Sequence, residues 1–159
     1  MCLSIRWGNE STKEWLKTFP DTITAYKVVL EKLHGWMDHK EVISVYPPIR
    51  TNTGAYKKTN TISSYDESRA GRINTGSKKG KYQPFFHLFL SETAARTWAD
   101  EVSVIDGEMV VLKCEIPKDQ ITTVGNQFST VRNQSSAAVI VTREFTFVEG
   151  DEYFDEKSS

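Results

Sequence analysis

The residues best placed to do chemistry are a cysteine near the start of the chain and two polar side chains within apolar segments. Cys2 follows the initiator methionine, and a cysteine exposed by methionine removal is the nucleophile of one class of amidohydrolase. His87 lies within FFHLFL, where alternation places it on the face of Phe85 and Phe89, a pattern more typical of a packed core histidine than of a general base. Glu144 interrupts an apolar segment, so an inward carboxylate would need a partner or a role, whereas a carboxylate on the solvent face, which the alternation after Val141 allows, would need neither. No nucleophile–base order is readable from these spacings.

Few residues remain for metal or disulfide chemistry. His34 and His39 lie five residues apart around a glycine, and the sequence has no CxxC or HExxH motif. The two cysteines, Cys2 and Cys114, are too few for a disulfide framework, and Cys114 has the surroundings of a small core residue. No stretch approaches the roughly 18 apolar residues of a membrane span, and no apolar segment indicates a signal peptide. We expect no metal site and a reduced, cytoplasmic protein.

The segment 50–82 differs from the rest of the chain in charge. Eight cationic residues against two acidic ones give it a balance of +6, and since the whole chain carries −1, the remainder carries about −7. Its lysines, arginines, hydroxyl groups and interleaved tyrosines suit contacts with phosphate and stacking on bases, although a solvated, idle loop has the same composition. The candidate ligand-binding residues are Arg50, Lys57, Lys58, Arg69, Arg72, Lys78, Lys79 and Lys81, together with His87.

Two helices and several strands are predicted from hydrophobic periodicity. An amphipathic stripe ends at Pro20, and Ser91 supplies an N-cap for a second helix. The predicted helices cover 10–20 and 92–102, and the predicted strands cover 22–30, 41–48, 82–91, 108–117 and 137–150, the last being the longest. Residues 121–131 are predicted as two short strands joined by a turn at Gly125 and Asn126.

These elements predict an α+β fold. We expect a single domain over 1–150, with a mixed or mainly antiparallel sheet, about two helices and a long polar basic loop over about 50–82. An acidic C-terminal tail is expected over 151–159.

Several short motifs resemble those of small uncharacterised phage and bacterial proteins that begin Met-Cys-Leu. In order they are MCL, AYKVV, VYPPIR, FFHLFLSETAARTWA and VVLKCEIPKDQI, which together span most of the chain. The resemblance implies a small phage-type accessory protein in the host cytoplasm, with a host-defence component as a possible partner. Cys2 then marks a shared beginning and is not a catalytic signal.

The segment FFHLFLSETAARTWADE also resembles a motif of ADP-ribosyltransferase-like folds, in which a hydrophobic strand and a Ser or Thr precede a helix that begins with small residues. The resemblance implies Ser91 as the motif hydroxyl, Glu144 as the late-strand acid and Tyr26 in the first strand, with NAD as cofactor. The sequence departs from that family because AYKVV lacks the Arg or His that binds the dinucleotide.

The sequence favours a protein that acts by binding and uses no cofactor. The expected partner is a phosphate-bearing ligand, either a nucleotide or a nucleic acid, or a host protein, and no membrane. Two alternatives stay open. One is an NAD-using, ADP-ribosyltransferase-like enzyme, and the other is a structural protein whose basic segment orders on a partner chain.

Overall fold

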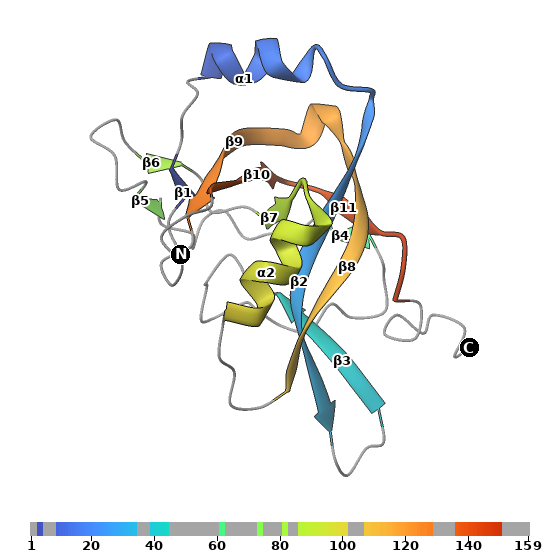
Figure 1. The fold of residues 1–159 in the computed structure, drawn as a ribbon. Coiled ribbons are helices and arrows are strands. Elements are labelled where there is room, and N and C mark those ends of the chain that lie inside the picture. The colour runs from blue at the N-terminus through green and yellow to red at the C-terminus, as the bar shows by residue number, and fades with distance from the viewer. Residues whose placement is uncertain are drawn as a thin grey trace.

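The computed structural model describes residues 3–4, 9–34, 39–44, 61–62, 73–74, 81–82, 86–101, 107–128 and 136–150 (Figure 1). The helices in this part of the chain are α1 (Asn9–Leu16), α2 (Glu92–Glu101) and the short 3-10 helix η1 (Lys118–Gln120). The strands are β1 (Leu3–Ser4), β2 (Thr22–His34), β3 (His39–Ser44), β4 (Thr61–Ile62), β5 (Ile73–Asn74), β6 (Lys81–Tyr82), β7 (Phe86–Phe89), β8 (Glu108–Pro117), β9 (Ile121–Phe128), β10 (Ser136–Thr142) and β11 (Phe145–Phe147).

The strands form one large sheet and a separate two-stranded pair. The large sheet has the order β1-β9-β10-β7-β2-β8-β11-β4, β3 pairs with β2 beside this path, and β5 pairs with β6. Every pairing in the described part is antiparallel. An antiparallel sheet with two α-helices confirms the α+β prediction at this level.

The strand β2 is the centre of the sheet. It is 13 residues long and rich in β-branched and aromatic residues, as strands require. Ten consecutive residues pair with β8, from Thr22 opposite Pro117 to Glu31 opposite Glu108. On its other side β2 pairs with β7 at Tyr26 and with β3 beyond Val28. Because side chains alternate along a strand, β2 contributes to a core on each of its two faces.

The first of these, the inner core, is enclosed by the sheet itself. Its buried residues come from β2, β7, β8, β9, β10 and β11: Ile23, Ala25, Val29, Phe86, Leu88, Leu112, Cys114, Ile116, Val124, Ile140, Phe145 and Phe147. Strands β7 and β11 are separated in the sheet by β2 and β8, yet the rings of Phe86 and Phe145 meet edge to face with centroids 5.2 Å apart. The sheet therefore curls around the inner core. Helix α1 adds Trp15 and Leu16 against it, followed by Phe19.

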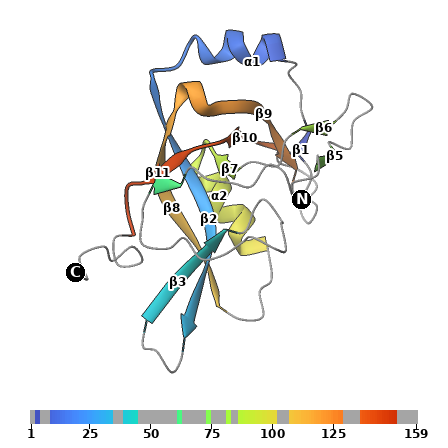
Figure 2. The ribbon, with the colours of Figure 1, turned by 180° about the vertical axis from the view of Figure 1, so that it is seen from behind.

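The second core, the α2 core, lies between the sheet and helix α2, which packs across β2, β7 and β8 (Figures 1 and 2). Its buried residues are Val28, Phe89, Ala95, Ala99, Val111, Val139 and Val141. Half-buried Trp98 packs against this core, with its ring centroid 6.0 Å from that of Phe89. The alanines Ala95 and Ala99 form the buried face of α2 against the sheet.

Two predictions about the later strands are wrong. Residues 121–128 form one continuous strand, and the expected turn at Gly125 and Asn126 is absent because both residues pair with β10. The expected single strand over 137–150 is broken at Arg143 and Glu144. The break lets one segment serve two parts of the curled sheet, since β10 pairs with β7 and β9 whereas β11 pairs with β8 and β4.

Buried Thr142 stabilises this break. Its Oγ1 lies 2.9 Å from the carbonyl oxygen of Glu144 and 3.2 Å from that of Gln120, and it accepts from the Glu144 N–H at 3.4 Å. The Arg143 N–H donates to the same Gln120 carbonyl at 3.1 Å. Backbone groups that leave the ladder at the break thus keep hydrogen-bond partners without water.

Candidate functional site

The candidate ligand-binding residues of the basic segment lie mostly outside the described residues. These are Arg50, Lys57, Lys58, Arg69, Arg72, Lys78 and Lys79. Within the segment the structure describes three two-residue strands, of which β4 is tied to β11 and β6, containing Lys81, is paired with β5. A hydrogen bond joins the hydroxyls of Thr61 and Thr146 at 3.2 Å. The basic segment is therefore anchored to the edge of the large sheet at β4.

His87 is buried in β7 and only 4% exposed. It pairs with Val141 of β10, and alternation places its side chain on the face of Phe89 in the α2 core. The core interpretation of this histidine fits its burial better than a binding role.

Tyr26 and Ser91, two residues implied by the ADP-ribosyltransferase-like resemblance, lie near each other. Tyr26 is half-buried against the α2 core and pairs with Phe89, two residues before Ser91. Ser91 precedes α2 and is exposed, and its Oγ accepts a hydrogen bond from the Ala94 N–H at 3.3 Å. The hydroxyl is thus the predicted N-cap of α2.

Glu144, the third residue implied by that resemblance, lies at the opposite end of β10. The Leu90 N–H donates to the carbonyl of Ala138 at 3.1 Å, which places Ser91 beside the N-terminal half of β10. Glu144 is six residues further along the chain, in the break between β10 and β11. Among the described residues no hydrogen bond joins Glu144 to Tyr26 or Ser91.

The most unusual buried group was not selected from the sequence as a site residue. Lys27 is 1% exposed and lies on β2 between Ala25 and Val29, on the face that forms the inner core. Its Nζ donates to the backbone carbonyl of His87 at 3.0 Å. The sequence did indicate this burial, since Lys27 shares one face of the predicted strand with the apolar residues Ile23 and Ala25.

Burial changes the acid–base chemistry of Lys27 and of its diagonal cross-strand neighbour Cys114. Desolvation lowers the pKa of the Lys27 amine to about 7, and a smaller electrostatic interaction with Cys114 opposes this. Cys114 pairs with Ala25, is fully buried, and has a thiol pKa that burial raises far above its usual range, with the Lys27 amine opposing the rise. Above pH 7 both groups are therefore neutral, and no ammonium–thiolate pair forms in the inner core.

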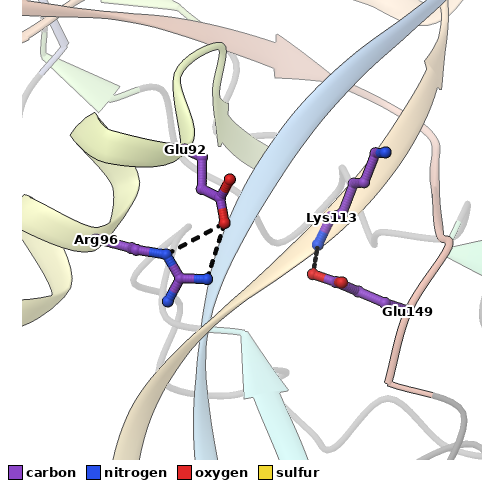
Figure 3. Close-up of polar contacts among 4 residues, drawn as sticks. All are labelled: Glu92, Arg96, Lys113 and Glu149. Carbon is purple, nitrogen blue, oxygen red and sulfur yellow. Dashed lines mark hydrogen bonds and ion pairs between the residues drawn. The ribbon is translucent and has the colours of Figure 1, made fainter.

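Figure 3 shows two polar contacts, one within helix α2 and one between β8 and Glu149. On α2, Arg96 donates to Glu92 Oε1 at 2.8 Å through Nη2 and at 3.2 Å through Nε. On β8, the backbone N–H of Lys113 donates to Glu149 Oε1 at 2.6 Å, while the Lys113 side chain extends away from that carboxylate. Both contacts are exposed, so neither forms an enclosed site.

A concave site lies where α1, the start of β2 and η1 meet, and we call it the α1 hollow. Its volume is about 440 Å³, within the range of small-molecule sites. The lining residues are Lys13, Leu16, Lys17, Asp21, Lys118 and Asp119. In both views the turn between β8 and β9, which contains η1, lies beneath the C-terminal end of α1 (Figures 1 and 2).

Main-chain hydrogen bonds fix the walls of the α1 hollow. The Lys118 N–H donates to the Asp21 carbonyl at 2.8 Å, and Lys118 Nζ donates to the Phe19 carbonyl at 3.1 Å. The turn after α1 is closed by the Phe19 N–H on the Leu16 carbonyl at 3.1 Å. The rings of Trp15 and Phe19, with centroids 4.1 Å apart, pack toward the inner core. The hollow is thus part of the folded framework.

Neither a metal centre nor a membrane-spanning helix is found in the part of the chain that the structure describes. No group of three or more His, Cys, Asp or Glu side chains there could hold a metal ion. No helix among those residues is both long and apolar enough to cross a membrane. The cysteine with the strongest sequence signal, Cys2, lies outside the described residues.

Comparisons with known proteins add no homology to these observations. No protein-family model, curated protein or solved structure matches this chain.

Proposed function

We infer that this protein acts by binding a phosphate-bearing ligand, a nucleotide or a nucleic acid, through the basic segment 50–82. The observation that carries the proposal is the separation of charge along the chain. The segment has a balance of +6 while the remainder carries about −7, so the two parts present potentials of opposite sign to a charged partner. Such a potential attracts phosphate groups, and tyrosines between the cations add faces on which bases stack.

The fold supports binding more than catalysis. The basic segment is joined to the rigid sheet through β4, which lets the sheet hold a binding surface in place. Of the residues implied by the enzyme alternative, Ser91 serves as the N-cap of α2, and the buried Lys27 and Cys114 are enclosed in the inner core. A phosphate-binding role needs no catalytic group, only cations and hydrogen-bond donors at the surface.

Salt-dependent binding tests the proposal. The full chain is titrated with a fluorescent single-stranded oligonucleotide and with a nucleotide at low and high salt. We expect affinity at low salt that falls steeply with salt, because bound phosphates release counterions. The variant Lys78→Gln/Lys79→Gln should weaken binding about tenfold, whereas the matched control Arg96→Gln/Lys113→Gln, which removes the same charge from the described surface, should not.

Two outcomes would contradict the proposal. One is no binding of either ligand at low salt, and the other is an equal loss of affinity in the two variant pairs, which would reduce the effect to net charge. Release of nicotinamide from NAD by the wild-type chain would instead support the enzyme alternative.

A further inference from the structure

We propose that the α1 hollow is a binding site for a nucleoside monophosphate, with lysine ammonium groups on the phosphate and an aspartate carboxylate on the ribose hydroxyls. The proposal rests on the proposed function in that the ligand bears phosphate, but it assigns a second, separate site and a more specific ligand. Six lining residues converge on this hollow from two segments that are far apart in sequence, 13–21 and 118–119.

The first observation is that charged groups of both signs line the hollow without pairing with one another, although Lys17 pairs with Glu14. In the described part of the chain the side chains of Lys13, Asp21 and Asp119 make no hydrogen bond or ion pair. Lys118 uses one donor on the Phe19 carbonyl and keeps others for a ligand. A ligand with both an anionic group and hydroxyl donors can satisfy the two kinds of group at once.

The second observation concerns which ligand has that combination. Three lysines and two aspartates line the hollow, and because Lys17 is paired with Glu14, Lys13 and Lys118 are the cations left for a phosphate. An aspartate carboxylate cannot accept from a phosphate dianion, but it accepts readily from ribose hydroxyls, as acidic residues do in dinucleotide-binding folds. Leu16 supplies an apolar surface for the sugar or base. The volume of about 440 Å³ admits a mononucleotide.

The third observation is pre-organisation. The hydrogen bonds from Lys118 to Asp21 and Phe19 join η1 to the turn after α1, so the two walls do not need to move on binding. Lys13 lies in the last turn of α1, and Lys17 follows the helix and donates to Glu14 Oε1 at 2.7 Å, so Lys13 and Lys118 are the cations that a bound phosphate would contact.

Calorimetric titration of the full chain with adenosine monophosphate, inorganic phosphate and adenosine tests the site. Lys13→Ala keeps a good helix former in α1 and should weaken adenosine monophosphate binding about tenfold. The double variant Asp21→Ala/Asp119→Ala should also weaken adenosine monophosphate binding, yet leave inorganic phosphate binding equal or tighter, because a carboxylate repels a free phosphate. Lys113→Ala, an exposed lysine on β8 away from the hollow, is the control and should change neither.

The opposite results would overturn the site. If removal of the two aspartates tightens adenosine monophosphate binding, the hollow attracts anions only and its carboxylates do not bind the ribose hydroxyls. If Lys13→Ala leaves the affinity unchanged while Lys78→Gln/Lys79→Gln abolishes binding, the hollow is not the site but the proposed function stands. If neither adenosine monophosphate nor an oligonucleotide binds the wild-type chain, both proposals fail.

Discussion

The two cores on either face of β2 are built differently. The inner core is closed by strands curling around it, and it contains buried polar groups in Lys27 and Thr142. The α2 core is covered by a single ten-residue helix that contributes two alanines, and its floor consists of valines and one phenylalanine, with buried His87 on the same face. One strand therefore borders a core whose buried amine and hydroxyl bond to backbone carbonyls and a core whose buried polar side chain is an imidazole.

The difference teaches how a curled sheet is held together. Neighbouring strands leave the ladder where the sheet bends, so backbone carbonyls lose their partners at the bend. At β7 the lost partner is replaced by the Lys27 amine on the His87 carbonyl, and between β10 and β11 it is replaced by the Thr142 hydroxyl. On the helix-covered face the buried polar side chain is His87 of β7.

The largest expected effect is the loss of stability when an aromatic side chain is removed, and it should differ between the two cores. Phe145 is fully buried and its ring meets those of Phe86 and Phe147 at 5.2 and 5.0 Å, whereas Phe89 contacts one ring, that of Trp98, at 6.0 Å. Phe145→Ala should reduce the free energy of unfolding by about 4 to 5 kcal/mol and Phe89→Ala by about 3 to 4, since each edge-to-face pair adds about 1 kcal/mol. Urea denaturation followed by circular dichroism measures both.

If Phe145→Ala proves too unstable to purify, Phe145→Leu and Phe89→Leu provide the same comparison with smaller losses. Equal losses in the two cores would show that the ring contacts of the inner core add nothing beyond burial.

The second effect concerns the buried amine of Lys27. The lowered pKa of about 7, against 10.5 in the unfolded chain, means that the unfolded state binds more protons between pH 7 and 10.5, so stability should rise with pH across this window. A pKa lowered from 10.5 to about 7 sets an upper limit of about 5 kcal/mol on the destabilisation below pH 7. Lys27→Met should therefore stabilise the protein by about 3 kcal/mol at pH 6, after allowing for the lost hydrogen bond to the His87 carbonyl.

Chemical denaturation of Lys27→Met and wild type at pH 6, 8 and 10 checks both the size and the sign. The advantage of the variant should shrink as pH rises, because the wild-type amine becomes neutral in the folded state first. An advantage that grows with pH, or a wild type with flat stability from pH 7 to 10, would contradict the assignment.

The smallest effect is on the helix side. Ser91→Ala removes the acceptor for the Ala94 N–H at the start of α2 and should cost about 1 kcal/mol. Hydrogen exchange of α2 amides should increase while the strands of the inner core keep their protection. Ser91→Asp retains a capping oxygen and serves as the matched control, so a loss as large as that of Ser91→Ala would rule out the capping role.

Much of the element order could be predicted from the sequence because local patterns decide it. The strand over 108–117 was predicted with its observed bounds, and the cap at Ser91 followed from a hydroxyl before a run of helix formers. The local sequence gives no reason to reject a turn at Gly125, because the pairing that extends β9 through this position comes from the distant strands β10 and β1. The break at Glu144 likewise depends on distant strands, since the part before the break pairs with β7 and the part after it pairs with β8.

The candidate sites were harder to predict for a related reason. The charge of segment 50–82 is a property of composition and is visible in the sequence. The α1 hollow joins Lys13 to Asp119, more than 100 residues apart, and only the hydrogen bonds from Lys118 bring them together. Lys27 shares a strand face with apolar residues, which indicates burial. The carbonyl that accepts its hydrogen bond belongs to β7 and could not be predicted from the sequence of β2 alone.

The contact between Glu149 and β8 has a consequence for self-association. Where β11 ends, the Val148 N–H donates to the Lys113 carbonyl at 3.0 Å and the Glu149 carboxylate accepts from the Lys113 N–H. Both hydrogen-bonding groups of Lys113 on that edge are thus occupied, one of them by a charged side chain that cannot continue a ladder. An acidic group at this position blocks a strand from another molecule from adding to β8 there, which is how natural sheets guard an open edge against aggregation.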